Sequence, residues 1–327
     1  MVQRILVIIT NPAQASFRLR IDALRPLLAE RGFELDIQVR PRAVFARRKL
    51  LRSAGRYHAI ILQRKLLDPA DARLLRRTAR RILFDIDDAV MFHAHPVGLF
   101  SRWRTNRRFE ATARILDHVV AGNEYLADMF RQRGRSVTVL PTCVDPARYK
   151  VKEHVKTPDA VALVWIGSRS TLPYLAELLP AIRAAAQRVP LKLITIADQT
   201  IENPGLPIEH VNWSVDNEAA ALARGDIGLA PTPDDRWTRG KCGFKIIQYM
   251  AAGLPVIASP VGANAEIVRV NETGLLATTP ADWTDAITTL AADLTLRRQM
   301  GRAGRQRVEQ EYALTRAADL WASVLLP

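Results

Sequence analysis

One stretch, residues 230–262, combines cations and small residues more densely than the rest of the chain. Its pattern predicts a strand, then a basic loop, then a helix that begins just after Gly243. Lys241, Lys245 and Gln248 are three or four positions apart, so on a helix or its first turn they share one face. Cations at a helix N-terminus oppose the helix dipole, so their presence favours an anionic ligand. A basic turn that is merely solvated is the alternative.

A second candidate anion site follows the apolar run Val161–Ile166, where Gly167-Ser-Arg-Ser-Thr171 leads into a predicted helix. Small residues at such a turn let backbone amides approach a phosphate, and the guanidinium of Arg169 can bind it through two nitrogens. Alone, this turn could also be a simple connector. The glycine patterns of dinucleotide-binding and P-loop proteins are absent, since Ile9–Ser16 contains no glycine, which argues against hydride transfer and P-loop chemistry.

Carboxylates and histidines gather near the end of a predicted strand at Ile82–Asp85. The motif Asp85-Ile-Asp-Asp88 has three interpretations: side chains that line a binding cleft, helix caps or ion pairs with nearby arginines, or metal ligands. His93 and His95 are the one closely spaced histidine pair. They lack a third ligand in the sequence, so a zinc site is disfavoured.

The composition indicates an intracellular globular protein. The chain has 327 residues, enough for two domains, with 48% apolar and 24% charged residues. Its two cysteines, Cys143 and Cys242, have no spacing typical of a disulfide framework or a zinc site, which fits a reducing cytoplasm. No apolar run is long enough to span a bilayer, and we interpret the apolar N-terminus as a buried strand.

The charge is unevenly distributed. Residues 1–150 contain 29 Lys and Arg against 14 Asp and Glu, whereas residues 151–327 contain 18 against 19, for a total net charge of +14. Such asymmetry predicts an anionic partner for the first half, with nucleic acid and anionic lipid as candidates. No nucleic-acid-binding motif is present, so we expect the anionic surface of a membrane, with peripheral attachment, and no nucleic acid. An arginine-rich solvated face is the alternative.

Short apolar runs alternate with amphipathic helical patterns along the chain, which predicts parallel sheets covered by helices. The expected strands of a first domain are Ile5–Ile9, Glu34–Val39, His58–Leu62, Ile82–Asp85, Val119–Ala121 and Val137–Leu140. Those of a second domain are Val161–Ile166, Leu191–Ile196, Glu209–Trp213, Ile227–Ala230 and Pro255–Ala258. The expected helices of the second domain include Leu172–Arg188, Glu218–Ala223, Phe244–Ala252, Glu266–Val270 and Asp282–Gln310. A polar stretch at Lys150–Asp159 predicts the linker between the domains.

The segment Gly243-Phe-Lys-Ile-Ile-Gln-Tyr-Met-Ala-Ala-Gly-Leu-Pro-Val-Ile-Ala-Ser259 resembles the C-terminal domain of retaining family 4 glycosyltransferases. Supporting pieces are Ser16-Phe-Arg-Leu-Arg20, Ala121-Gly-Asn-Glu-Tyr-Leu126, Pro141-Thr-Cys-Val-Asp145, Gly262, Glu266-Ile-Val268, Asn271-Glu-Thr-Gly-Leu-Leu276 and Glu309-Gln-Glu-Tyr312. The resemblance implies an α/β GT-B fold, in which two Rossmann-like α/β/α domains face each other across a cleft. It implies an acceptor-binding domain at 1–150, a nucleotide-sugar-binding domain at 151–311, and a helix at 312–327 that crosses back to the first domain.

The resemblance also implies transfer of a sugar from a nucleoside diphosphate with retention at the anomeric carbon, without a metal or another cofactor. With the residue types and spacing above, it gives the following candidates: Arg169, Lys245 and His93 in catalysis; Gly167, Ser168, Gly243, Phe244, Gln248, Asp235 and Trp237 at the donor; and Ser16, Arg18, Arg20 and Asp88 at the acceptor. Two alternatives stay open: Trp237 belongs to the core, and Arg18 and Arg20 solvate the first helix. The expected acceptor is a cell-envelope glycan or a lipid-linked glycan.

The chain departs from the family pattern in two respects. The family has a pair of glutamates that contact the donor, and Gly240 and Gln248 stand in their places. The family also has a lysine shortly after the arginine that Arg169 matches, but Leu172-Pro-Tyr174 stands there, so Lys245 is the expected second cation. Gln248 can still form a hydrogen bond, but without charge. Three alternatives therefore stay open beside a transferase: a nucleotide-sugar epimerase or hydrolase of the same fold, a homologue without catalytic activity, and a nucleic-acid-binding protein.

Overall fold

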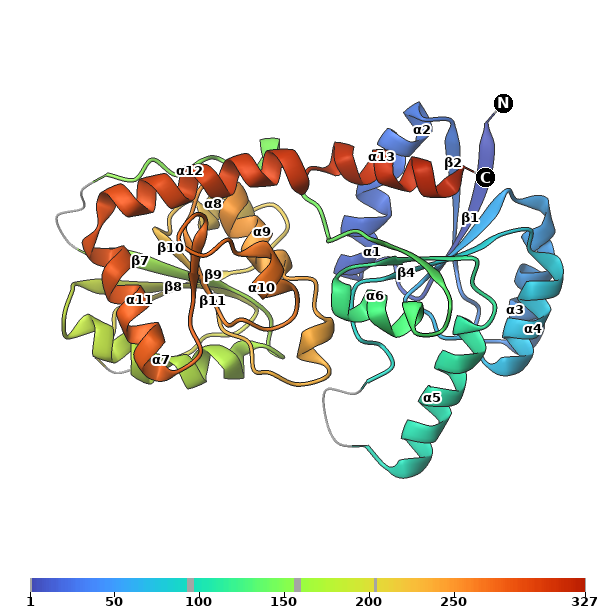
Figure 1. Cartoon of the computed structure of the whole chain (residues 1–327), viewed down its shortest axis with the longest axis horizontal. Helices are drawn as coiled ribbons and strands as arrows, with labels where there is room; N and C mark the ends of the chain where they lie inside the picture. The colour runs from blue at the N-terminus through green and yellow to red at the C-terminus, as the bar shows by residue number, and fades with distance from the viewer. Residues whose placement is uncertain (1, 93–96, 156–159, 203–204, 327) are drawn as a thin grey trace. The chain divides into compact units, whose positions relative to one another are not determined.

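A computed structural model describes residues 2–92, 97–155, 160–202 and 205–326 (Figure 1). The predicted catalytic residue His93, with His95, lies outside the described residues. The chain forms two compact units. The first unit comprises Met1–Cys143, Asp235–Cys242 and Leu314–Pro327, and the second comprises Val144–Asp234 and Gly243–Ala313. Each unit is an α/β domain with its own parallel sheet, as predicted.

The first unit is built on a six-stranded parallel sheet with the order β2-β1-β3-β4-β5-β6. Its strands are β1 (Gln3–Ile9), β2 (Phe33–Val39), β3 (Ala59–Gln63), β4 (Ile82–Ile86), β5 (His118–Ala121) and β6 (Ser136–Val139). All five residues of β3 and of β4 are buried, because helices cover both faces of the sheet. The predicted strands agree with these bounds to within one or two residues.

Helices flank this sheet on both sides (Figure 1). They are α1 (Ala15–Arg20), α2 (Arg25–Glu30), α3 (Val44–Arg52), α4 (Pro69–Thr78), α5 (Leu99–Ala113), α6 (Glu124–Arg131) and α13 (Leu314–Leu325). The C-terminal helix α13 packs in the first unit, where Trp321 and Leu325 join the core formed by β1 and α2. The expected return of the chain's last helix to the first domain is therefore observed.

The second unit has a six-stranded parallel sheet with the order β12-β11-β10-β7-β8-β9. Its strands are β7 (Val161–Ile166), β8 (Leu191–Ala197), β9 (Ile208–Asn212), β10 (Ile227–Ala230), β11 (Val256–Ala258) and β12 (Gly274–Leu276). The edge strand β12 was not predicted, because three residues carry no readable periodicity. It pairs with β11 along its whole length.

The helices of the second unit are α7 (Leu172–Ala186), α8 (Glu218–Leu222), α9 (Phe244–Ala251), α10 (Ala263–Ile267), α11 (Pro280–Ala292) and α12 (Leu294–Glu311). The prediction of one helix over 282–310 was wrong. Two helices meet at Asp293, whose carboxylate accepts a hydrogen bond from the amide of Leu296 at 2.9 Å and so caps the start of α12.

Candidate functional site

The ligand-binding edge of a parallel α/β sheet is the one at the carboxyl ends of its strands. Most of the predicted site residues lie at this edge in one unit or the other. We describe the two edges separately.

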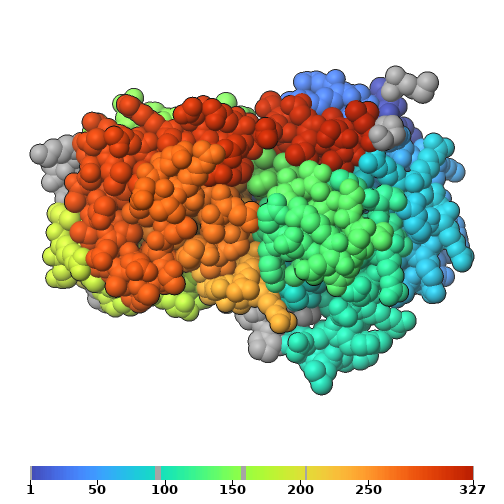
Figure 2. All heavy atoms as spheres, viewed as in Figure 1, coloured from blue at the N-terminus to red at the C-terminus, as the bar shows by residue number. Residues whose placement is uncertain are grey.

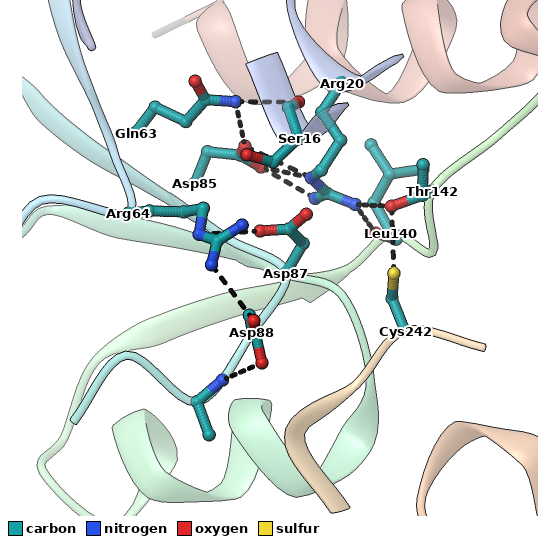
Figure 3. A network of polar contacts seen from close by, with 11 residues as sticks. Ser16, Arg20, Gln63, Arg64, Asp85, Asp87, Asp88, Leu140, Thr142 and Cys242 are labelled. Atoms are coloured by element: carbon teal, nitrogen blue, oxygen red, sulfur yellow. Dashed lines mark hydrogen bonds and ion pairs between the residues drawn. The ribbon is translucent and has the colours of Figure 1, made fainter. Parts of the chain in front are cut away.

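An ion pair between Arg20 and Asp85 is the centre of the first unit's edge (Figure 3). Arg20 lies at the end of α1 and Asp85 near the end of β4, and their side chains are 2% and 0% exposed. Nη2 of Arg20 lies 2.7 Å from Oδ1 of Asp85, and Nε contacts both carboxylate oxygens. Burial lowers the pKa of Arg20, but the attraction of Asp85 outweighs this and raises the pKa.

The remaining groups of this network come from three other parts of the unit. Nη1 of Arg20 donates to the carbonyl of Leu140 at 2.9 Å and lies 3.3 Å from the Thr142 hydroxyl. Gln63 donates to the carbonyl of Ser16 at 3.0 Å and lies 3.4 Å from Asp85. Nitrogens Nε, Nη1 and Nη2 of Arg20 all donate within the protein, and the side chain is almost completely buried. We therefore revise the expectation that Arg20 binds an acceptor, since it positions the loops around it instead.

Two further carboxylates flank the buried pair. Asp87 and Asp88 follow β4, and the Arg64 side chain lies 3.3 Å from Oδ1 of Asp87 and 3.1 Å from Oδ2 of Asp88. The backbone of Arg64 is left-handed, with φ of 54°, a conformation that is uncommon for a residue with a side chain. Of the three interpretations of Asp85–Asp88, the structure therefore shows ion pairs with arginines.

Asp88 is the more accessible of these carboxylates. Its side chain is 21% exposed, whereas that of Asp87 is 9% exposed. Burial raises the pKa of Asp88, and Lys241 and Arg64 oppose this increase. Ser16 is buried, and its hydroxyl has no hydrogen-bond partner among the described residues. Arg18 is partly exposed on α1. Ser16, Arg18 and Asp88 stay as candidate acceptor residues.

The segment Asp235–Cys242 packs with the first unit, although the sequence analysis placed it in the second domain. The carboxylate of Asp235 accepts the amides of Trp237 and Thr238 at 2.7 and 2.8 Å, which closes a tight turn. Trp237 packs against the core of the first unit, and Nζ of Lys241 lies 3.6 Å from the centre of its ring. The predicted donor residues Asp235 and Trp237 thus belong to a different unit from the other predicted donor residues.

Asn123 fixes this segment in place. Its side-chain amide donates to the carbonyls of Arg239 and Lys241 at 3.0 and 2.8 Å, and its oxygen caps α6 through the amide of Leu126. Between these two carbonyls lies Gly240, where an added Cβ would approach the Cβ of Ala89 to 2.4 Å. The position at which the family has a glutamate is therefore closely packed against the protein itself.

At the edge of the second sheet, the turn after β7 is held by its own small side chains. The amide of Ser168 lies 3.2 Å from the Thr171 hydroxyl, and the hydroxyls of Ser168 and Ser170 are 2.9 Å apart. A Cβ on Gly167 would lie 2.3 Å from the ring of Trp165, so a larger residue at this position would displace the ring. The amide of Arg169 donates to Asp198 at 2.9 Å, while Arg169 itself is exposed.

Lys245, in the first turn of α9, lies at the same turn. Its Nζ is 3.3 Å from the hydroxyl of Thr171 and 4.6 Å from the centre of the Trp165 ring. Gly243 directly precedes helix α9; its φ of 63° is left-handed, and its Cβ position is closed by the Ile267 side chain. Phe244 packs against the core of this unit. The structure thus brings together predicted residues that are more than 70 positions apart in sequence, Lys245 and the 167–171 turn.

Gln248 occupies an enclosed position on α9. It is 3% exposed, and its amide donates to the hydroxyl of Tyr149 at 3.2 Å. Burial raises the pKa of Tyr149 to about 12, so this hydroxyl stays protonated at neutral pH. The buried, neutral amide of Gln248 is thus paired with a neutral hydroxyl.

Sequence reasoning gave no role to several residues of these networks, which are Gln63, Arg64, Asn123, Thr142 and Tyr149. A readable signal existed for Asn123, since an asparagine between a buried strand and a helical pattern is typical of a helix cap. Gln63 and Arg64 are polar residues directly after the apolar run of β3, where the edge of the sheet is expected. Thr142 lies in the segment 141–145, which takes part in the family resemblance, whereas Tyr149 carries no such signal.

Within the described part of the chain, no group of three or more His, Cys, Asp or Glu side chains is arranged to hold a metal ion. The same residues include no helix with the length and hydropathy needed to cross a membrane.

Comparison with known proteins bears on both units. Residues 160–293 match the model of the family described as glycosyl transferases group 1. A stretch of 85 residues is 33% identical to the alpha-1,3/1,6-mannosyltransferase ALG2 of Rhizomucor pusillus. That match spans 26% of this chain and 19% of the fungal protein.

Solved structures resemble the whole chain. HepE from Anabaena, crystallised with UDP and glucose, is 16% identical, with 99% of both chains covered and a TM-score of 0.71. Sucrose-phosphate synthase from Thermosynechococcus elongatus is 17% identical, with 98% of both chains covered and a TM-score of 0.73. The fold is therefore GT-B, as the sequence analysis expected. Together the comparisons support a glycosyltransferase of the group 1 type.

Proposed function

We propose that this protein is a retaining glycosyltransferase of family 4 that moves a sugar from a nucleoside-diphosphate sugar to a cell-envelope glycan or lipid-linked glycan. The reaction takes place at the cytoplasmic face of the cell membrane, to which the basic first unit attaches. The observation that carries the proposal is the convergence of Arg169, Lys245 and the small-residue turn 167–171 at one edge of the second sheet. The nucleotide seen with HepE agrees with a nucleotide-sugar donor.

The diphosphate is the part of the donor that this edge suits. When the sugar leaves, negative charge builds up on the departing diphosphate, and cations aimed at it lower the barrier. Arg169 supplies a guanidinium fork, Lys245 supplies a point charge, and the first amides of α9 at Gly243 and Phe244 have no partner inside the helix. In this mechanism protein cations perform the task that a metal ion performs elsewhere, so turnover continues in EDTA.

The acceptor is assigned to the first unit. Asp88 and Arg64 lie at the carboxyl edge of its sheet, together with the unpartnered hydroxyl of Ser16. Carboxylate and hydroxyl groups suit the hydroxyls of a sugar, and the neighbouring cations suit a phosphate-bearing acceptor. His93 stays a predicted contact of the reacting sugar.

One observation favours a second candidate, a nucleotide-sugar-binding homologue without catalytic activity. Neither Gly240 nor Gln248 provides a carboxylate, Gly240 is packed against Ala89, and Gln248 is paired with Tyr149. Such a protein would bind the donor and leave it intact.

Proton NMR of donor turnover separates these candidates. The purified chain is incubated in EDTA with UDP-, GDP-, ADP- and dTDP-sugars and an extract of bacterial lipids and glycans. The proposal predicts a new glycosidic anomeric signal with the configuration of the donor. An inverted product or a strict requirement for added metal contradicts it. Sugar release or epimerisation that needs no acceptor indicates a hydrolase or epimerase, and binding without turnover indicates the inactive homologue.

A further inference from the structure

The N-terminal half of α5 exposes large apolar side chains. Leu99, Phe100 and Trp103 are 82%, 70% and 53% exposed, whereas the buried residues of this helix, Phe109, Thr112 and Ala113, lie near its other end. The helix projects from the body of the first unit (Figures 1 and 2). Exposed apolar residues that stand singly need no explanation, but a group on one element marks a surface that meets a partner.

These side chains share one face of the helix. Phe100 and Trp103 are three positions apart and stack at 5.8 Å between ring centres, and Leu99 and Trp103 are four positions apart. The guanidinium of Arg107, one turn further along, lies 5.3 Å from the ring of Trp103. Arg102 and Arg104 are exposed on either side of this face. The result is an apolar face with cations on its borders.

A second exposed apolar pair lies at the start of α3, where Val44 and Phe45 are 53% and 78% exposed. Helices of a parallel α/β sheet run opposite to the strands, so α3 and α5 both begin at the carboxyl edge of the first sheet. The two helices pack on either side of α4, within one layer. Both apolar groups therefore lie toward the same edge of the unit.

Cations outnumber carboxylates between the two helices. Arg40 and Arg47 lie 3.2 and 2.5 Å from Asp71, and Arg108 lies 2.7 Å from Asp68. Burial lowers the pKa of Lys65, and the nearby arginines 40, 47 and 108 lower it further. Four basic side chains thus gather around two aspartates, which leaves a positive field on this edge.

We propose that the N-terminal ends of α3 and α5 dock the protein on an anionic phospholipid bilayer, with Phe45, Phe100 and Trp103 inserted among the headgroups. An apolar face with cationic borders is what binds a helix to the plane of a charged membrane, and charge complementarity selects anionic lipid over another protein surface. The inference rests on the proposed function only in that it assumes a reaction at the membrane. It assigns the membrane-binding surface to the ends of α3 and α5, at the sheet edge to which the acceptor is assigned.

Flotation with vesicles tests this docking face. The wild-type chain should float with phosphatidylcholine vesicles that contain about 30% phosphatidylglycerol, which mimic a charged leaflet. It should not float with vesicles of pure phosphatidylcholine. The variant Arg102→Gln/Arg104→Gln/Arg107→Gln should bind about a hundredfold more weakly. Phe100→Ala/Trp103→Ala should weaken binding by roughly tenfold or more, and this loss should persist at high salt.

The matched control removes equal charge from the other end of the same unit. Arg56, Arg77 and Arg80 are exposed and lie near the C-terminal ends of α3 and α4. The variant Arg56→Gln/Arg77→Gln/Arg80→Gln should keep most of the binding. Equal losses in the two arginine variants would overturn the proposal, because they would show that total charge alone drives association.

Trp103 gives a readout at the face itself. Lipids brominated near the headgroup should quench part of the wild-type tryptophan fluorescence, and Trp103→Phe should remove this part of the quenching. Quenching that is unchanged in Trp103→Phe, or a concentration-dependent dimer that Phe100→Ala/Trp103→Ala abolishes, would overturn the proposal. Nucleotide affinity measured on the same variants should be unchanged, so a failure of docking is distinguishable from a failure of the proposed function.

Discussion

The carboxyl edges of the two sheets use charge in opposite ways. In the first unit, Arg20 and Asp85 are buried together, and Arg64 lies against Asp87 and Asp88, so arginine and aspartate compensate each other. In the second unit, Arg169 is exposed, and Nζ of Lys245 contacts a hydroxyl and an aromatic ring. Arginine next to aspartate builds a rigid edge, whereas cations beside small residues suit an anionic ligand.

Residues of the same type therefore have different tasks at the two edges. Buried ion pairs contribute little net stability compared with apolar packing, but breaking one is costly because it leaves a buried charge alone. Arg169 is exposed and Lys245 is partly exposed, so neither is a fully buried charge. Substitutions in the buried Arg20–Asp85 pair should therefore change stability, and substitutions of Arg169 and Lys245 should change donor binding.

The largest effect is expected for Asp85→Ala. It leaves the guanidinium of Arg20 buried without its carboxylate, which should lower the free energy of unfolding by about 3–5 kcal/mol. The double variant Arg20→Met/Asp85→Leu should recover much of this loss, because it removes both charges. Urea unfolding measures the difference.

The control for Asp85→Ala is Asp285→Ala, which removes a partner of the exposed pair Arg188–Asp285, with side chains 53% and 67% exposed. Exposed pairs contribute about 0–1 kcal/mol. Equal effects of the two substitutions would show that the Arg20–Asp85 pair is not the structural centre of the first edge.

Lys245→Ala and Arg169→Ala should each weaken nucleoside-diphosphate binding by about tenfold to a hundredfold, because each removes a charge-assisted contact. Thermal unfolding without nucleotide should be nearly unchanged. Isothermal titration calorimetry is the measurement, and Arg302→Ala, an exposed arginine of α12, is the control. If both variants bind the nucleotide as tightly as the wild type, the diphosphate does not bind at this edge.

Gly240→Ala tests the packing of the segment 235–242 on the first unit. The added methyl group would meet the Cβ of Ala89 at 2.4 Å, so we expect a loss of about 1–3 kcal/mol in the free energy of unfolding. At Gly98 the same substitution meets nothing within 4 Å and serves as the control. If urea unfolding shows Gly240→Ala to be as stable as Gly98→Ala, the segment does not pack as described.

The smallest effect concerns pH and a histidine in the second unit. His154 is buried, its Nε2 lies 2.9 Å from the carbonyl of Gly253, and burial lowers its pKa below the ordinary value of 6.5. The unfolded chain then binds a proton on this histidine more readily than the folded chain. The contribution of His154 to stability is therefore fully present above pH 6.5 and is lost as the pH falls below that value.

His154→Gln should reduce this loss of stability between neutral and acid pH. His118 has a lowered pKa for the same reason, so His118→Gln is measured in parallel to separate the two contributions. Thermal midpoints recorded across pH give the slopes. A slope that is identical in wild type and His154→Gln would contradict the buried neutral histidine.

Most strands could be predicted because a buried parallel strand is a nearly continuous apolar run, as in Ile5–Ile9 and Val161–Ile166. The ends of helices were harder to predict. The break between α11 and α12 depends on a single helix cap, at Asp293. The packing of 235–242 with the first unit depends on hydrogen bonds from Asn123, which is more than 100 positions away in the sequence.

The candidate site was predicted in part. Glycine, lysine and arginine in loops after strands predicted an anion site, and the structure places Lys245 next to the turn 167–171. The burial of Arg20 could not be predicted, since an arginine on a short helix gives no sign of whether a carboxylate lies opposite. That information resides in the pairing of β4 with its neighbours.

The central claim is that the edge formed by 167–171 and Lys245 binds a nucleoside diphosphate through protein cations. Calorimetric titration of the wild-type chain with UDP, GDP, ADP and dTDP, each in EDTA and in magnesium, tests it most directly. We predict that one nucleotide binds in EDTA with an affinity that magnesium does not increase and that Lys245→Ala reduces. Binding that appears only with magnesium, or no binding of any nucleotide, would contradict the account.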